Sequence, residues 1–263
     1  MSLTIGTAPL AGSSSTAELN FSLADAPKHQ IVFQADPRRL RAMIGDTVVL
    51  DTVRAHLLYE TGMSARIYAP LEDYLAGALT PTEPTTHCPV KGDAHYWTVR
   101  ADGKEVTDGL WGYAEPTAEA PFLKGYASLY QDKVDAWFVE EDRVVGGELR
   151  DPYHRVDAHL STRPVVVRVN GEEVARSQRP VLVFETGLPV RAYVPPADVH
   201  GGRVAAGSGR RAFCPYKGES TFWTVAGVED AAWSYESPLP DALRAQGHLA
   251  FDDTVEGVEV TLG

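Results

Sequence analysis

The sequence is poor in cysteine and in positive charge. Its 263 residues include only two cysteines, and 24 lysines and arginines face 36 acidic residues, for a formal net charge of −12. Two cysteines are too few for a disulfide framework, so a reducing cytoplasm is the simplest compartment. An acidic chain is repelled at long range by phosphate backbones and by anionic lipid. We therefore expect neither nucleic acid nor a membrane as a partner.

Long apolar runs are also absent, which excludes a membrane-spanning helix. Residues 1–20 have neither the basic residues nor the sustained apolar core of a secretory signal, and we expect residues 1–26 to form a flexible lead-in. Hydrophobic residues still make up 44% of the chain, which is ample for a buried core. The composition thus indicates a soluble globular protein.

The sequence repeats itself in order. Residues 54–62, Arg-Ala-His-Leu-Leu-Tyr-Glu-Thr-Gly, return as residues 179–187, Arg-Pro-Val-Leu-Val-Phe-Glu-Thr-Gly, at an offset of 125 (179 minus 54). The two cysteines open the most distinctive segment of each copy, Cys-Pro-Val-Lys-Gly from Cys88 and Cys-Pro-Tyr-Lys-Gly from Cys214. Ordered repetition at a nearly constant offset indicates duplication of a whole domain rather than a short repeat.

We place the first domain at residues 27–140 and the second at residues 155–263. The charged segment 141–154, which contains Gly and Pro, is typical of a linker. A fused pair of this kind would be an intramolecular pseudo-dimer.

The local patterns in each copy predict strands. Asn170-Gly171 lies between the β-branched run 165–169 and residues 172–175, which is a strong hairpin signal. Short helices are expected at residues 71–79 and at 240–246, the second one ended by Gly247. Further strands are expected at residues 180–184, 191–194, 221–225 and 248–251. The pattern predicts two all-β, mainly antiparallel domains with few short helices.

Six motifs occur in this order: Arg-x5-Glu, Tyr-x-Pro-x2-Asp, Cys-Pro-Tyr-Lys-Gly, an aromatic-Trp pair, Trp-x-Tyr-x2-Pro and a late Gly-x3-Phe. Together they resemble the family called "domain of unknown function 427", here in tandem. The resemblance implies a compact domain of the Mss4-like or β-tent type, a group that includes zinc-binding modules and the methionine-sulfoxide reductase B scaffold. The family has no settled activity, although a label suggesting nucleotidyl transfer has been attached to it.

The sequence contains no Asp-x-Asp pair to hold magnesium on phosphates and no Gly-x4-Gly-Lys-Ser/Thr phosphate loop, so the transferase label finds no support in these residues. Zinc-binding relatives use paired Cys-x-x-Cys motifs, whereas this chain has one cysteine per domain. We therefore expect no zinc and no other cofactor, and a fold that is held by apolar packing.

Lys217 is the only lysine of the second copy, and it recurs in the first as Lys91. The amine of lysine is compact and can lose its proton, whereas a guanidinium stays charged, so the repeated lysine suggests a catalytic or binding role. It would contact a ligand carboxylate or phosphate, or lower the pKa of the neighbouring thiol. The alternative is a turn whose lysine caps a buried glutamate such as Glu60 or Glu185.

Cys88 and Cys214 are candidate nucleophiles, but buried free cysteines often pack as small hydrophobes. A catalytic thiol usually needs a nearby base, and no histidine recurs close to the motif in both copies. A redox role would require the two Cα atoms to lie within about 7 Å. Nucleophile, structural thiol and redox partner therefore stay open.

Residues that recur at equivalent places are candidates to line a pocket. They are Trp223, Tyr235, Tyr193, Arg179 and Glu185, and Tyr216, whose place is taken by Val90 in the first copy, is a further candidate. Arg179 with Glu185, like Arg54 with Glu60, would form either a buried ion pair or a substrate clamp. Aromatic walls with few polar groups are typical of a small-molecule site, and packing in the core is the alternative.

We therefore expect a cytoplasmic protein that binds a small anionic metabolite at the Cys-Pro-Tyr/Val-Lys-Gly turn. Whether this turn is also catalytic stays open at this point. One alternative is a non-catalytic interaction or structural module whose motifs serve the fold. The other is a thiol redox protein.

Overall fold

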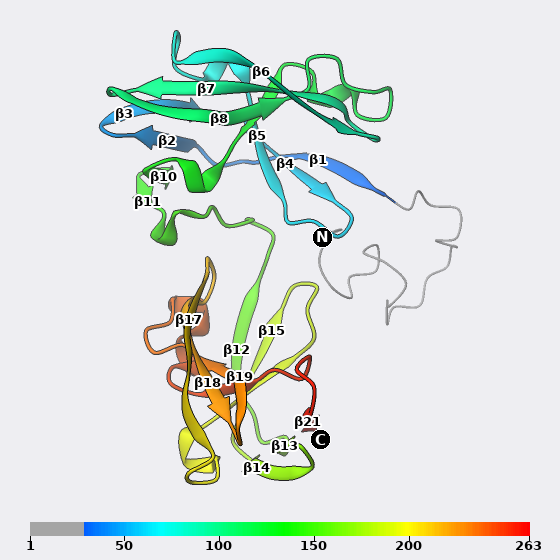
Figure 1. The fold of residues 1–263 in the computed structure, drawn as a ribbon, viewed down its shortest axis with the longest axis vertical. Helices are drawn as coiled ribbons and strands as arrows, with labels where there is room; N and C mark the ends of the chain where they lie inside the picture. The colour runs from blue at the N-terminus through cyan, green and yellow to red at the C-terminus, as the bar shows by residue number, and fades with distance from the viewer. Residues whose placement is uncertain (1–28) are drawn as a thin grey trace. The chain divides into compact units, whose positions relative to one another are not determined.

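The computed structural model describes residues 29–263, which form two compact units that meet in the sequence between Tyr153 and His154 (Figure 1). The predicted lead-in lies outside the described residues. All strand pairs within residues 29–263 are antiparallel, and the helical segments there are short 3₁₀ turns. Over the same range, no helix has the length and apolar character needed to cross a membrane.

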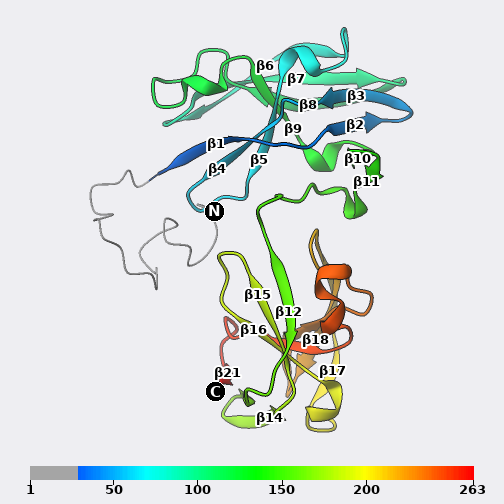
Figure 2. The same cartoon turned by 180° about the vertical axis from the view of Figure 1, so that it is seen from behind.

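The first unit contains two sheets that lie face to face (Figures 1 and 2). The larger sheet has seven strands in the order β1 (Ile31–Ala35), β4 (His56–Glu60), β5 (Arg66–Pro70), β9 (Tyr126–Leu129), β8 (Lys104–Gly112), β7 (Gly92–Ala101) and β6 (Leu79–Cys88). The smaller sheet has four, in the order β11 (Asp142–Arg143), β10 (Ala136–Val139), β2 (Leu40–Ile44) and β3 (Thr47–Thr52).

The second unit repeats this strand order. Its larger sheet consists of β12 (Val156–Leu160), β15 (Val181–Glu185), β16 (Arg191–Val194), β20 (Leu249–Phe251), β19 (Val228–Ser234), β18 (Gly218–Val225) and β17 (Val204–Cys214). Its smaller sheet consists of β14 (Glu172–Ser177), β13 (Val165–Val169) and β21 (Val258–Leu262). Every strand of the first unit except β11 has a counterpart here, which confirms two similar all-β domains. Membership of the Mss4-like or β-tent group stays a prediction.

Local turn chemistry accounts for most of these elements. The predicted hairpin is confirmed, because Asn170 and Gly171 take φ angles of 51° and 80° between β13 and β14, as a two-residue turn requires. The 3₁₀ helix η6 (Pro240–Ala245) confirms the second predicted helix. The helix expected at residues 71–79 is wrong. Only η1 (Leu71–Asp73) forms, because Gly77 turns the chain with a φ of 79° and Leu79 already begins β6.

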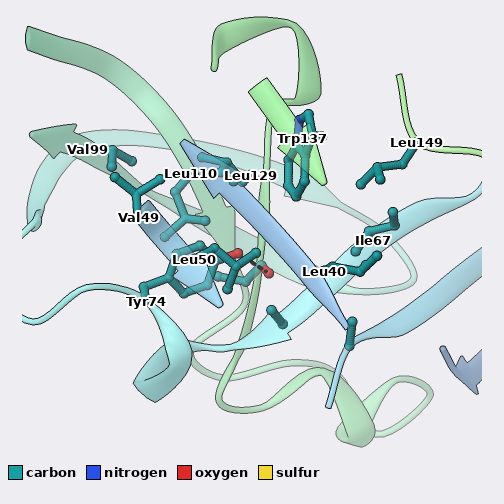
Figure 3. Close-up of a cluster of buried hydrophobic side chains, with 14 of the residues drawn as sticks. Leu40, Val49, Leu50, Ile67, Tyr74, Val99, Leu110, Leu129, Trp137 and Leu149 are labelled. Carbon is teal, nitrogen blue, oxygen red and sulfur yellow. Dashed lines mark hydrogen bonds between the residues drawn. The ribbon is translucent and has the colours of Figure 1, made fainter. Parts of the chain in front are cut away.

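Each larger sheet is packed on both faces, because successive side chains of a strand point to opposite sides. In β4, Leu57 and Tyr59 belong to the core between the two sheets, which Figure 3 draws in part. Leu58, between them, belongs to a smaller cluster with Tyr68 and Tyr113 on the other face. The second domain divides its core in the same way. The smaller clusters position the candidate site.

Candidate functional site

Glu60, at the end of β4, is only 3% exposed and contacts two basic side chains. The Nζ of Lys91 donates a hydrogen bond to its Oε1 at 2.6 Å, and the Nε2 of His29 lies 3.1 Å from its Oε2. Lys91 is itself only 7% exposed. Buried charges are stable only when they are paired, so these groups depend on one another.

The second domain contains the same arrangement around Glu185. Lys217 donates a hydrogen bond from Nζ to Oε2, and the Nε2 of His154 lies 3.0 Å from Oε1. We call each glutamate, with its lysine and its histidine, the Glu-centred cluster of its domain. The lysine therefore caps a glutamate that is buried in the first copy and mostly buried in the second. This agrees with the second interpretation of the sequence, in which the lysine caps a glutamate.

The hairpin turns β6–β7 and β17–β18 place the two lysines. Gly92 and Gly218 close these turns with φ angles of 98° and 99°, which an L-residue rarely adopts. A Cβ on Gly92 would also lie 3.3 Å from the carbonyl oxygen of Glu115, and one on Gly218 would lie 3.3 Å from that of Ser237. The Gly of the Cys-Pro-x-Lys-Gly motif is thus needed for the turn that directs the lysine.

Cys88 is half-buried and free, and it belongs to the same small cluster as Tyr68 and Tyr113. Burial raises the pKa of both tyrosines above their usual range, and the nearby Glu60 contributes to the increase. Both phenols therefore stay protonated at neutral pH. The Nζ of Lys91 lies 5.6 Å from the ring centroid of Tyr113, within cation–π range.

Cys214 has the matching surroundings in the second domain. Burial raises the pKa of Tyr193 and of Tyr235, and the nearby Glu185 and Cys214 increase both values further. The indole Nε1 of Trp233 donates a hydrogen bond to the hydroxyl of Tyr193 at 3.2 Å. Each domain thus gathers a carboxylate, an ammonium, an imidazole, a thiol and two protonated phenols.

The protonation of Glu185 links this cluster to stability. Burial alone would raise its pKa, but the hydrogen bond with His154 and the charge of Lys217 bring it below the usual value of 4.5. A lowered pKa in the folded state means that the stabilisation is complete above pH 4.5 and is lost as the pH falls through the folded pKa.

We therefore predict that Glu185→Gln destabilises the second domain at pH 7, and that its difference from the wild type shrinks progressively below pH 4.5. Hydrogen exchange of the β15 and β18 amides measures this domain by itself within the full chain. A difference between wild type and variant that stays constant down to pH 3, well below the ordinary pKa of Glu, would contradict the prediction.

The predicted pairing of Arg54 with Glu60 and of Arg179 with Glu185 is wrong. The Arg54 guanidinium is exposed and contacts Asp73 and Glu72, and Arg179 pairs with Asp198 at 2.8 Å. Since each arginine comes just before its strand, it lies beside the short 3₁₀ turn of the Tyr-x-Pro-x2-Asp motif. The recurring Arg and Asp therefore hold that turn in place.

The predicted joint pocket of Trp223, Tyr193 and Tyr235 is also wrong. The two tyrosines pack in the small cluster with Tyr216 and Trp233, whereas Trp223 packs against the core between the sheets. The indole Nε1 of Trp223 donates a hydrogen bond to Ser234 Oγ at 2.8 Å. The alternation of side chains along the strands places Trp223 on the opposite face of the larger sheet.

His29 and His154 are site residues that were not predicted from the sequence. Their offset is 125 (154 minus 29), the same as for Arg54 and Arg179, and each has a proline two positions earlier. No histidine recurs close to the motif in the sequence, as predicted. In the structure, however, His29 and His154 contact the same glutamates as the lysines of the motif. His154 was not predicted as a site residue because it lies in segment 141–154, which was predicted to be a linker. The constant offset was the signal that would have identified it.

The described residues also contain clefts away from the Glu-centred clusters. One of about 500 Å³ in the first domain is lined by Arg66, Trp111 and Tyr130, among others. Another of about 360 Å³ lies in the second domain, with Trp223 in its wall. Within residues 29–263, no three His, Cys, Asp or Glu side chains are grouped so that they would hold a metal ion.

Two similar antiparallel β domains, each with a Glu-centred cluster at a Cys-Pro-x-Lys-Gly turn, define a tandem all-β protein. The family model of the domain of unknown function DUF427 matches residues 32–140 and 157–261. The chain therefore belongs to this family and carries its domain twice. No curated protein matches the chain.

Proposed function

We propose that the protein binds a small molecule at the Glu-centred cluster and exchanges a proton with it through the histidine. The observation that carries this proposal is a single carboxylate, buried in the first domain and mostly buried in the second, that contacts both an ammonium and an imidazole. Buried ion pairs are often no more stabilising than apolar residues of similar volume. Their retention in both copies, beside a thiol and two phenols, supports a role in chemistry.

The imidazole is the group of the cluster that a ligand would reach. The side chain of His29 is 34% exposed, whereas those of Lys91 and Glu60 are 9% and 4% exposed. The charge of the lysine is compensated by the carboxylate, so an anionic group would bind the protonated imidazole rather than the lysine. Histidine changes its charge near neutral pH and can therefore accept or donate a proton there.

The first domain is the more open of the two. His154 is only 6% exposed, and its ring lies against that of Tyr216, with 4.3 Å between the centroids. The position of Tyr216 is occupied by Val90 in the first domain, which leaves His29 accessible. We infer that the first domain holds the working site and that Tyr216 closes the second.

Exchanging these two residues tests the proposal. Val90→Tyr should protect His29 from modification by diethylpyrocarbonate and abolish the response of the protein to its ligand. Tyr216→Val should expose His154 to the same reagent. Modification is measured for each histidine by mass spectrometry of the full chain, with the exposed His87 as an internal control. The ligand response is a thermal-shift and NMR screen with neutral, carboxylated and phosphorylated metabolites.

A response that survives in Val90→Tyr and in His29→Gln would overturn the proposed site, and so would the absence of any response in the wild type. His87→Gln is the matched control, because it also removes a histidine from the first domain but lies outside the Glu-centred cluster. It should leave the response unchanged.

The second candidate is a structural module without catalysis. It is favoured because both carboxylate oxygens of Glu60 already have partners, His29 and Lys91. Through them Glu60 connects the residue ahead of β1 with the β6–β7 turn. In that case Glu60→Gln and Glu185→Gln would lower stability, and no metabolite would give a response that depends on His29. The unfolding and screening experiments together distinguish the two functions.

A further inference from the structure

A cleft of about 360 Å³ opens in the second domain, and none of the Glu-centred cluster lines it. Its apolar wall includes Trp223, Val199, Val204 and Leu249. Trp223 belongs to β18, and its ring is half-buried between the cleft and the core. Because the cleft and the cluster involve opposite faces of the larger sheet, they are separate sites.

A chain of hydrogen bonds leads from the wall of this cleft to a carboxylate. The indole Nε1 of Trp223 donates to Ser234 Oγ at 2.8 Å, and Ser234 Oγ donates to Glu236 Oε1 at 2.6 Å. Ser234 is only 1% exposed, whereas Glu236 lies at the surface. Glu236 forms no ion pair with any residue of the described chain, so its negative charge is not compensated there.

His200 is the other titratable group that lines the cleft. Its Nδ1 lies 3.0 Å from the carbonyl oxygen of Glu173, and a carbonyl only accepts, so Nδ1 carries a hydrogen. In the neutral imidazole, Nε2 is then an acceptor. Both polar side chains at the rim, Glu236 and His200, can therefore accept hydrogen bonds from a ligand.

The first domain has the tryptophan of this cleft but not its polar groups. Trp97 matches Trp223, whereas Gly112 and Ala114 stand where the second domain has Ser234 and Glu236. No side chain fits at Gly112, because a Cβ there would lie 2.7 Å from the carbonyl oxygen of Tyr126. The hydroxyl and the carboxylate are therefore specific to the second domain and are not required for the shared fold.

We propose that this cleft binds an organic cation, namely an amine with an apolar body of about the size of a phenylethyl group. The ammonium would lie between Glu236 and the ring of Trp223, since tryptophan is the best cation–π partner among the side chains. Val199, Val204 and Leu249 would cover the apolar body. The formal charge of −12 also attracts cations at long range.

The test compares 2-phenylethylamine with 2-phenylethanol, which has nearly the same shape but no charge. Both are titrated into the full chain, and binding is followed at the indole N–H resonance of Trp223, assigned with Trp223→Phe. We expect the amine to bind at least about tenfold more tightly than the alcohol, as a carboxylate and an aromatic ring together allow.

Two substitutions copy the first domain and remove one polar group each. Glu236→Ala should weaken amine binding about tenfold, and Ser234→Gly should weaken it less, because it frees the carboxylate from its hydrogen bond but does not remove its charge. Glu229→Ala, which removes an exposed acid of β19 outside the cleft, is the matched control and should bind the amine like the wild type. Equal binding of amine and alcohol, no saturable amine binding, or full affinity in Glu236→Ala would each overturn the proposal.

Discussion

Replacing Lys91 by methionine should lower the stability of the first domain by about 3–5 kcal/mol, the usual effect of removing one partner from a buried ion pair. The reason is that the carboxyl group of Glu60 would lose its ammonium partner at a site that is 3% exposed, with only the partly exposed His29 beside it. Methionine preserves most of the volume of the side chain, so the loss reports on charge rather than on packing. Urea unfolding, together with hydrogen exchange of the β4 and β7 amides, measures it.

Lys104→Met provides the control, because Lys104 pairs with Asp135 at the surface, where both side chains are about half exposed. Surface ion pairs contribute little, so this variant should unfold almost like the wild type. Adding Glu60→Leu to Lys91→Met should restore much of the lost stability, because it removes the uncompensated charge. If Lys91→Met proves as mild as Lys104→Met, the cluster is not a buried charge pair in solution.

Replacing Trp137 by alanine should cost the first domain about 3–5 kcal/mol, as is typical when a fully buried aromatic side chain is removed. Trp137 is 1% exposed and lies on β10, where it fills the core between the sheets with Leu40 and Leu129 (Figure 3). Its indole Nε1 also donates a hydrogen bond to the carbonyl oxygen of Gln131 at 3.1 Å, and this partner would be left without it.

Trp137→Phe should cost less than Trp137→Ala, because the phenyl ring keeps part of the contacts although the hydrogen bond and some of the volume are lost. Val53→Ala, at a position that is 67% exposed, serves as the control and should change little. Thermal unfolding followed by circular dichroism ranks the three variants. A Trp137→Ala protein that melts with the Val53→Ala protein would show that the core does not depend on β10.

The fold could be predicted largely from the sequence, because its signals are local or repeated. Asn170-Gly171 specifies its own turn, and the ordered repetition shows that both halves share one architecture. The helix expected at residues 71–79 failed because Gly77 and the start of β6 compete with it. Gly77 and Leu79 thus outweigh the helical pattern of the residues around them.

The site was less predictable, because its contacts join residues far apart in the sequence. Glu60 lies 31 residues from both His29 and Lys91, and nothing local distinguishes Lys91 from Arg54 as its partner. That choice depends on how β4, β6 and β7 are arranged in the sheet. The face of the sheet on which Trp223 lies was not predictable either. It depends on strand register, because a shift of one residue moves every side chain of a strand to the other face.

β1 and β12 each lie at the edge of their larger sheet and pair there with one neighbouring strand only, β4 or β15. Edge strands are the elements most easily exchanged between molecules or extended by foreign chains. His29 and His154 come just before these strands and attach them through side chains, in addition to the ladder of backbone hydrogen bonds. The Glu-centred cluster therefore also anchors the start of each edge strand, which opposes its exchange between molecules.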